Sequence, residues 1–440
     1  MDADGISSAA IMIKLLKKLQ FKFSLSIVQQ LTNDVLKQLS REHYSQYIFT
    51  DLGSGQINNI KGNLANRKAL ILDHHLLTKD VKQYENIMHV NPFIHGIDGG
   101  TAVSGSGVVY LFSKQVFEIK DMAHIALLGA IGDMQENDGF SELNNVILED
   151  ATKAGKIRIE RGLRFFGYQT KPLYQMLKYS TDLYIPGVTG DDKGAAEFMQ
   201  SLGIQLKRGD DFTKLSDLNE EEMKNLAAAI ILKRKKEENP DDIFGNIYVL
   251  TDEKHGSPTR DAREFSTLLN ACGRLGRASL GMGACLGNEN NKIAAISSLQ
   301  DYKNEIIKAV NWYWTNINTP YVIKGDKYII INAQDNILAT INGTLASILS
   351  KSGNFEDGTL IMAMAQLIDN TTKVSLRVSG KVNESVDLRK ILKSIIKETG
   401  GEAGGHRLAA GAIVPTEKER MFVEKAKVIL KKAVMEEMVV

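Results

Sequence analysis

The chain has 440 residues, of which 43% are hydrophobic and 24% charged, and its formal net charge is +1. This length predicts two or three domains, and the composition excludes a disordered or fibrous protein. The small net charge excludes nucleic-acid binding through bulk positive charge, so any polyanion must be bound by a local patch.

The first 140 residues alternate between helical and strand-like segments. Residues 6–20 and 31–42 have helical patterns, and residues 22–28 alternate polar and apolar side chains as a strand does. Apolar strands are predicted at 46–53, 68–75 and 86–92, followed by helices from about 107 and at 122–138. This alternation predicts a parallel α/β sheet, whose ligands bind beyond the carboxyl ends of the strands.

The remainder of the chain changes character twice. Residues 141–320 are mainly helical and charged, whereas short strands separated by turns begin at about 321 and a last helix is predicted at 416–436. The two cysteines, Cys272 and Cys285, are too few for a disulfide framework or a four-cysteine zinc site. With no apolar run of about 18 residues and no signal peptide, we expect a cytoplasmic protein without a membrane span.

Acidic and imidazole side chains follow the predicted strands. Asp51 ends one strand, Asp73, His74 and His75 end the next, and Asp133 lies near the end of a helix. Carboxylates bind Mn²⁺ and Mg²⁺, and imidazole among them favours Mn²⁺, Fe²⁺ or Zn²⁺. We therefore expect one or two divalent cations, which together can activate water and neutralise charge in phosphoryl transfer.

Two of these assignments have structural alternatives. Asp133 could simply end its helix, and Asp2 and Asp4 could belong to a terminal tail without a function.

A second constellation lies late in the sequence. The stretch "GGEAGGHRLAAG" (400–411) surrounds His406 with glycines, including Gly404 and Gly405, and reads as a helix start. Glycine backbone can approach an anion closely, and a helix N-terminus favours negative charge. Ser375 and Arg377 share one face of a predicted strand, where the guanidinium either binds a phosphate or carboxylate, or forms a surface ion pair.

The order of these motifs resembles the DHH phosphoesterase superfamily, and most closely the RecJ-like single-strand nucleases of archaea. The resemblance is carried by Asp-x-Asp-Gly at 2–5, "DLG" at 51–53, "DHH" at 73–75, "GAIGDM" at 129–134 and the stretch at 400–411. The segment "DAREFSTLLNACGRLGRASLG" (261–281) also resembles the archaeal branch. The resemblance implies an α/β fold with a parallel-sheet DHH catalytic domain (1–200), a largely helical linker or insertion (201–320) and a smaller α/β DHH-associated domain (321–440).

The resemblance also implies roles for individual residues. Two Mn²⁺ or Mg²⁺ ions would be bound by Asp2, Asp4, Asp51, His74 and Asp133, with Asp51 between the ions. His75 would contact the scissile phosphate or assist proton transfer, and Asp73 would orient a histidine. Substrate phosphates would be held by Ser375, Arg377, Gly404, Gly405 and His406.

The sequence departs from the family pattern at its beginning. Family members begin with a strand leading into His-x-Asp-x-Asp, and neither that strand nor that histidine precedes Asp2. Either the start codon is assigned too late or one metal site is crippled by a true loss. We favour the first explanation because the other ligands are all present.

The function implied is a metal-dependent exonuclease on single-stranded DNA or RNA in replication or repair, working in a cleft between the catalytic and C-terminal domains. One alternative is a scaffold that joins the replicative helicase through the GINS complex with weak or no nuclease activity. Another is a phosphodiesterase acting on short oligonucleotides or cyclic dinucleotides. Cleavage polarity, the choice between DNA and RNA, and oligomeric state are not encoded in these motifs.

Overall fold

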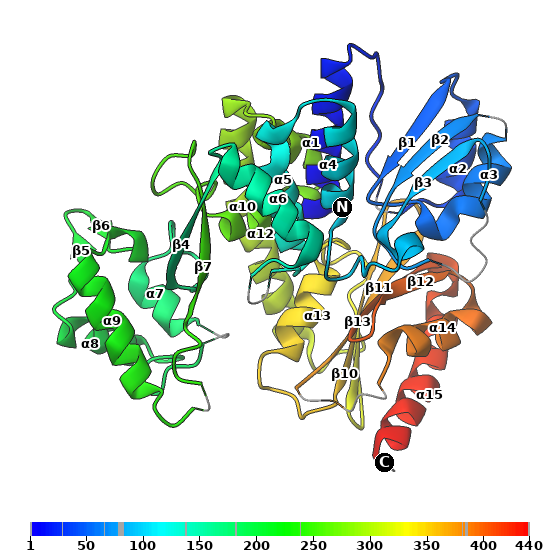
Figure 1. The fold of residues 1–440 in the computed structure, drawn as a ribbon. Helices are drawn as coiled ribbons and strands as arrows, with labels where there is room; N and C mark the ends of the chain where they lie inside the picture. Colours follow the sequence, from blue (N-terminus) through cyan, green and yellow to red (C-terminus); the bar gives the residue numbers. More distant parts are fainter. Residues whose placement is uncertain are drawn as a thin grey trace. The chain divides into compact units, whose positions relative to one another are not determined.

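The computed structural model (Figure 1) describes residues 2–28, 30–65, 67–77, 83–136, 139–180, 183–237, 239–380, 382 and 386–438. The chain divides into two compact units, residues 1–298 and 299–440. Among the described residues, none of the helices combines the length and apolar character needed to cross a bilayer.

The first unit begins with alternating helices and strands. These are α1 (Ala3–Lys18), α2 (Asn33–Arg41), β1 (Gln46–Thr50), α3 (Ile57–Leu64), β2 (Lys68–Leu72), β3 (Ile87–Val90), α4 (Gly105–Val116), α5 (Ala123–Gly132) and α6 (Glu142–Lys153). Short 3₁₀ turns lie at Ser54–Gln56, Pro92–His95 and Lys120–Met122.

The three strands form a parallel sheet in the order β1-β2-β3, with Ile48 opposite Leu70 and Leu70 opposite Met88. Apolar side chains of α2 and α3 pack with the sheet in one core, and those of α1, α4 and α5 form a second core that includes Leu72. Because parallel strands end at the same edge, the residues that follow β1 and β2 come together. The predicted parallel α/β sheet is confirmed.

The rest of the first unit contains a module with its own core, inserted between two antiparallel strands. These strands are β4 (Ile157–Leu163) and β7 (Phe244–Leu250). Between them lie α7 (Leu173–Lys178), α8 (Asp192–Ser201), β5 (Lys207–Arg208), β6 (Asp211–Phe212), a 3₁₀ turn (Leu215–Asp217) and α9 (Glu220–Lys233). Thereafter come α10 (Ala262–Arg274), which packs against α1 and α5, and α11 (Ala278–Cys285). The long α12 (Glu289–Asn316) begins in the first unit and continues into the second.

The second unit is built on a six-stranded sheet in the order β12-β13-β11-β10-β9-β8. The strands are β8 (Val322–Gly325), β9 (Tyr328–Asn332), β10 (Leu360–Gln366), β11 (Thr371–Val378), β12 (Glu402–His406) and β13 (Ala409–Pro415). The helices are α13 (Asn342–Ser350), α14 (Leu388–Thr399) and α15 (Glu419–Met438), with a 3₁₀ turn at Thr416–Lys418. Alternate residues of β10 pack into different cores, one with α13 and the other with α14 and α15.

The structure corrects two predicted elements. Residues 22–28 are not a strand: the backbone forms no ladder with the described strands, and Phe23 and Leu25 are 37% and 45% exposed. Alternating side chains favour an extended backbone, but a strand also needs a partner for its N–H and C=O groups. The middle segment is mainly helical, as predicted, and in addition contains the β4–β7 pair.

The stretch 400–411 does not start a helix but forms the hairpin of β12 and β13. Gly401 and Gly405 both have φ of +119°, far from helical values. A Cβ atom at Gly405 would lie 2.5 Å from the Ala409 carbonyl oxygen, so glycine is required for the close pairing. The glycines therefore serve strand pairing rather than a helix N-terminus.

Candidate metal centre

Asp51 follows β1 directly and carries an unusual backbone conformation. Its φ is +61°, in the left-handed region that Asp tolerates better than most residues, and its N–H donates to the Leu72 carbonyl at 2.8 Å. Such backbone strain is found preferentially at functional sites. The turn directs the Asp51 carboxylate away from the sheet and toward the N-terminal ends of α1 and α4.

Asp2 and Asp4 belong to an ordered helix N-terminus. Asp2 caps α1 by accepting the Gly5 N–H at 3.1 Å, and Asp4 is fully buried in the first turn. The Asp4 carboxylate accepts the backbone N–H groups of Gly105 (2.6 Å) and Ser106 (2.9 Å) and the Ser106 hydroxyl. The N-terminus of α4 therefore stabilises this buried charge through both hydrogen bonds and its dipole.

Two glycines provide the space for these carboxylates. A Cβ atom at Gly105 would lie 2.4 Å from Asp51 Oδ1, and one at Gly129 would lie 2.2 Å from Asp4 Oδ1. Both distances are too short for any side chain. The "GSG" start of α4 and the "GAIG" end of α5 therefore let three chain segments meet around the acidic side chains.

His74 lies at the centre of the cluster. Its Nε2 is 3.2 Å from Asp133 Oδ2, 3.5 Å from Asp51 Oδ1 and 3.7 Å from Asp4 Oδ2. Its other ring nitrogen, Nδ1, lies 2.7 Å from the Gly99 carbonyl oxygen, which can only accept. Nδ1 therefore carries a proton, and Nε2 faces the three carboxylates.

The buried carboxylates raise one another's pKa, so a positive charge among them would stabilise the cluster. Burial, and next the charge of Asp4, raise the pKa of Asp51 well above its usual range and that of Asp133 to about 6. Burial lowers the pKa of His74, but the nearby carboxylates of Asp133 and Asp51 outweigh burial and raise this pKa well above its usual value. A cation between the carboxylates would relieve the repulsion that raises the pKa values of Asp51 and Asp133.

The donor set fits divalent cations. Ligand atoms of Asp4, His74 and Asp133 lie within 4.8 Å of one another, and so do those of Asp51, His74 and His75. Asp51 Oδ1 and His74 Nε2 are buried without a hydrogen-bond partner in the described structure. Buried polar atoms normally have partners, so these two atoms are suited to bind an ion. Asp2 belongs to neither triad, although it lines the same cavity.

A second network holds His75. Asp73 is buried, and its Oδ1 lies 2.7 Å from His75 Nδ1 and also accepts the backbone N–H groups of His74 and His75. The other carboxylate oxygen accepts the Ser54 N–H at 2.8 Å. The hydrogen bond to Asp73 raises the pKa of His75, whose side chain is 55% exposed. His75 is thus a fixed, partly exposed imidazole that readily carries a proton.

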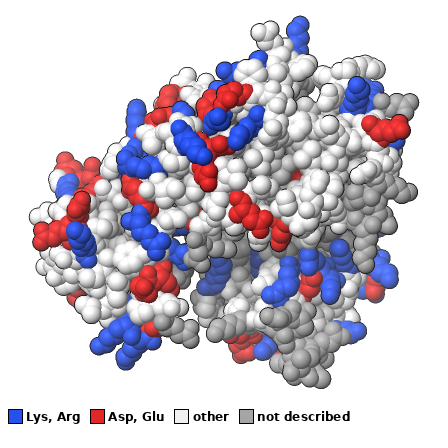
Figure 2. Space-filling view, in the orientation of Figure 1, with Lys and Arg blue, Asp and Glu red and all other residues white. Residues whose placement is uncertain are grey.

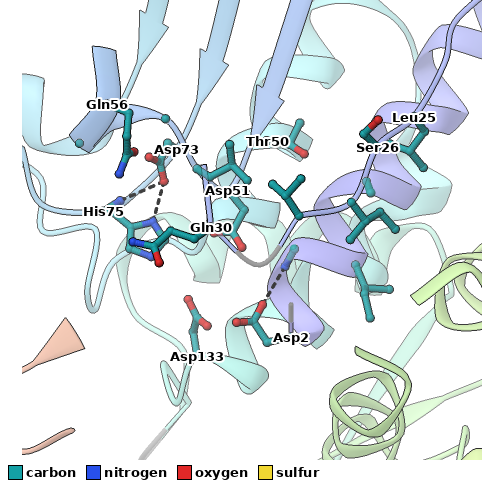
Figure 3. A pocket seen from close by; sticks show the side chains of 18 of the residues that line it. Asp2, Leu25, Ser26, Gln30, Thr50, Asp51, Gln56, Asp73, His75 and Asp133 are labelled. Atoms are coloured by element: carbon teal, nitrogen blue, oxygen red, sulfur yellow. Dashed lines mark hydrogen bonds and ion pairs between the residues drawn. The ribbon is translucent and has the colours of Figure 1, made fainter. Parts of the chain in front are cut away.

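A cavity of about 360 Å³ opens beside the cluster. Figure 3 shows Asp51, Asp133 and His75 around it, with Asp2 nearby and Leu25 and Ser26 on the opposite side. The cavity therefore has one acidic wall and one largely apolar wall, the latter contributed by residues 25–28 and α1.

The predicted phosphate-binding residues all lie in the second unit, on adjacent strands. Ser375 of β11 and Gly404 of β12 both pair with Gly411 of β13, so the three residues form one row across the sheet. Ser375 is buried, and its hydroxyl donates to Asn342 Oδ1 at 2.9 Å. Arg377, in the row of His406, donates through Nε to Ser347 Oγ at 2.9 Å. Gly404 and Gly405 are exposed on β12. The register gathers all five predicted residues on neighbouring rows of one sheet.

Several residues that surround the centre were not predicted from the sequence. Ser106 and Gly99 lie in the glycine-rich stretch 95–107, whose glycine and serine content was the available signal. Gln135 and Asn144 hydrogen-bond around Gly99, and nothing in their local sequence marks them.

Comparison with known domain families agrees with this architecture. The DHH family N-terminal domain matches residues 1–132, the DHH-CID domain matches 165–243 and the DHHA1 domain matches 326–432. An uncharacterized protein of Methanocaldococcus jannaschii is 31% identical over 435 residues, which cover 98% of this chain and 91% of that protein.

Solved structures share the fold at low sequence identity. CDC45 from Entamoeba histolytica matches 98% of this chain and 94% of its own, with a TM-score of 0.64 and 11% identity. RecJ from Thermus thermophilus in complex with Mn²⁺ gives a TM-score of 0.55 at 14% identity, covering 98% of this chain and 51% of that one. A further structure of exonuclease RecJ bound to manganese gives 0.54 at 14% identity, covering 99% and 90%.

Proposed function

We propose that this chain, which belongs to the DHH phosphoesterase superfamily and has the RecJ-like order of domains, is a metal-dependent exonuclease on single-stranded nucleic acid. The observation that carries the proposal is the position of His74 Nε2 among three carboxylates, with Asp51 Oδ1 buried and unpartnered. The RecJ structures with Mn²⁺ and with manganese share this fold and support the choice of ion.

The acidic residues would hold the cations. Asp4, His74 and Asp133 offer one set of ligands, Asp51 adds a carboxylate oxygen 3.5 Å from His74 Nε2, and Asp2 lines the same cavity. Such ions supply a nucleophilic water at neutral pH and neutralise charge on the phosphate. The protein's own contribution is to keep the carboxylates close together and buried, through the N-terminus of α4 and the glycines that pack against them.

His75 is suited to proton transfer or phosphate contact. Asp73 holds its Nδ1, which fixes the ring and leaves Nε2 free to act on a substrate oxygen. Because Asp73 also raises the pKa of His75, the ring can donate a proton to the leaving oxygen or bind a phosphate as imidazolium. Asp73 therefore acts through His75 rather than on the substrate.

The second unit is suited to bind a polyanion. α14 presents exposed lysines at helical spacing, and α14 packs beside β12 and β13, which carry the exposed glycines. These lysines are Lys390, Lys393 and Lys397. Figure 2 shows Lys and Arg side chains gathered over this part of the second unit. With a net charge of only +1, such a local patch, together with Arg377 and His406, is where we expect phosphates of the strand to bind.

The test is hydrolysis of end-labelled single-stranded DNA and RNA by the full chain. We expect EDTA to abolish product formation and Mn²⁺ to restore it, and we expect Asp51→Ala and His74→Ala to lose activity. Asp34→Ala, which changes an exposed carboxylate of α2, is the matched control. Hydrolysis that persists in EDTA, or in both active-site variants, would refute the proposal.

A replication scaffold is the second candidate function, and the similarity to CDC45 over nearly the whole length of both chains favours it. In this role the chain would join the replicative helicase through GINS, and cleavage would be weak or absent. Recovery of helicase factors by the wild type and by Asp51→Ala and His74→Ala in equal amounts, without detectable cleavage, would support the scaffold over the nuclease.

A third candidate keeps the chemistry and changes the substrate to short oligonucleotides. Rates on substrates of about two and about twenty nucleotides separate these alternatives, because a single-strand channel gains binding energy from several nucleotides. A higher kcat/KM on the longer substrate is expected for the exonuclease.

A further inference from the structure

A chain of buried side-chain amides runs from α6 to the metal centre. Gln135 lies two residues after Asp133 and is 6% exposed, and Asn144 lies in α6 and is fully buried. Neither belongs to the donor triads. Burying amides is costly, so the hydrogen bonds that their NH₂ groups make indicate their role. Asn144 Oδ1 is buried without a partner in the described structure, whereas Asn144 Nδ2 and both polar atoms of the Gln135 amide are paired.

The two amides converge on one backbone carbonyl. Gln135 Nε2 donates to the Gly99 oxygen at 3.0 Å, and Asn144 Nδ2 donates to Gln135 Oε1 at 2.8 Å. The Gly99 oxygen is the same atom that accepts the N–H of His74 Nδ1 at 2.7 Å. Gln135 and His74 are therefore joined through a shared acceptor.

Backbone hydrogen bonds also hold the two amide residues, and the turn at Gly99 packs closely against His74. Gln135 N–H donates to the Ala130 carbonyl at 2.9 Å, after Met134 at a φ of +60°, and Asn144 N–H donates to the Ala102 carbonyl at 3.0 Å. A Cβ atom at Gly99 would lie 2.2 Å from the His74 carbonyl oxygen, so the turn packs directly against the histidine backbone. A displacement of this turn would therefore be transmitted to His74.

We propose that Gln135, oriented by Asn144, is a positioning residue that holds the Gly99 carbonyl in place and thereby fixes the tautomer and direction of the His74 ring for cation binding. This inference rests on the proposed function of the site as a metal centre. Partners in the outer shell of a ligating histidine typically change metal affinity by about 10–100-fold when they are removed. Gln135 acts through His74 and does not touch the ions.

The experiment measures Mn²⁺ binding to the full chain by calorimetry. Gln135→Met keeps the length and volume of the side chain but removes its donor, and we expect the Kd for Mn²⁺ to rise by about 10–100-fold. Hydrolysis at low Mn²⁺ should fall and should recover as the Mn²⁺ concentration is raised. Gln115→Met, on the exposed side of α4, is the matched control and should bind Mn²⁺ as the wild type does.

Further measurements separate positioning from a loss of fold and from a wrong assignment of function. Thermal unfolding in EDTA checks that Gln135→Met folds. If this variant does not fold, the measurement is made on Asn144→Ala, which keeps Gln135 but removes the donor that orients it. For Asn144→Ala we expect a smaller increase in the Kd for Mn²⁺. The inference is overturned if a folded Gln135→Met variant, or Asn144→Ala measured in its place, binds Mn²⁺ with unchanged affinity. This holds even if the protein is a nuclease. A raised Kd in a chain that hydrolyses no nucleic acid supports the inference and refutes the proposed function.

Discussion

Replacing Asp133 by Asn should stabilise the metal-free protein while weakening its metal binding. Asp133 is largely buried beside Asp4, and burial with this neighbouring charge raises its pKa from 3.8 to about 6. A difference of this size corresponds to about 3 kcal/mol that the ionised carboxylate costs the folded state. Asn cannot ionise and escapes this cost, but it offers a poorer ligand to a cation.

The effect has a definite pH dependence. Below the unfolded pKa of 3.8 the carboxyl is protonated in both states, so Asp133→Asn and the wild type should differ little at about pH 3. As the pH rises the unfolded state ionises first, the wild type loses stability, and the full cost is present above about pH 6. At pH 7.5 we expect the variant to melt higher by roughly 5 °C.

Thermal unfolding in EDTA and in excess Mn²⁺ provides the assay. At a Mn²⁺ concentration of about 100 times Kd, the wild type should gain about 2.7 kcal/mol per independent site, and the variant should gain less. The exposed carboxylate of Asp34, changed in Asp34→Asn, is the control and should affect neither measurement. An Asp133→Asn variant that is no more stable than the wild type at pH 7.5 in EDTA would refute the electrostatic reasoning.

Three other predictions concern different parts of the chain. Gly129→Ala would place a Cβ atom 2.2 Å from Asp4 Oδ1. We therefore expect this variant to lose Mn²⁺ binding in calorimetry and about 1–3 kcal/mol of stability in urea unfolding. Unchanged Mn²⁺ binding would show that the added Cβ atom does not displace Asp4. Burial raises the pKa of Glu264 to about 7, so Glu264→Gln should be more stable than the wild type. The gain in stability should grow from about pH 4.5 to pH 7 and reach about 3 kcal/mol. Urea titrations that give the same difference in stability at pH 5 and pH 8 would contradict this prediction. Changing both Lys393 and Lys397 to Gln should lower the slope of log K against log salt for single-stranded DNA by about 1.4; an unchanged slope would place the polyanion elsewhere.

The strand ends of the first unit were predictable from the sequence. Apolar runs ending in Asp51 and Asp73 indicate parallel strands, and parallel strands bring their carboxyl ends to one edge. The position of Asp133 at the end of α5 also followed from the helical pattern. These features depend on local periodicity, which a single sequence displays.

Features that depend on distant partners were not predictable. Residues 22–28 alternate as a strand does, yet the described structure gives them no ladder partner, because pairing is decided by segments elsewhere in the chain. The same holds for Gln135, whose role depends on Gly99 and Asn144. The hairpin at 400–411 was missed because glycines serve helix starts and close strand pairing alike.

The central claim is that the side chains around His74 bind divalent cations, and crystals soaked in Mn²⁺ test it most directly. Anomalous difference density beside Asp4, Asp51, His74 and Asp133 is the result that we predict, with two peaks flanking the Asp51 carboxylate. Crystals that take up Mn²⁺ only at other positions, with these four side chains free of any ion, would contradict it.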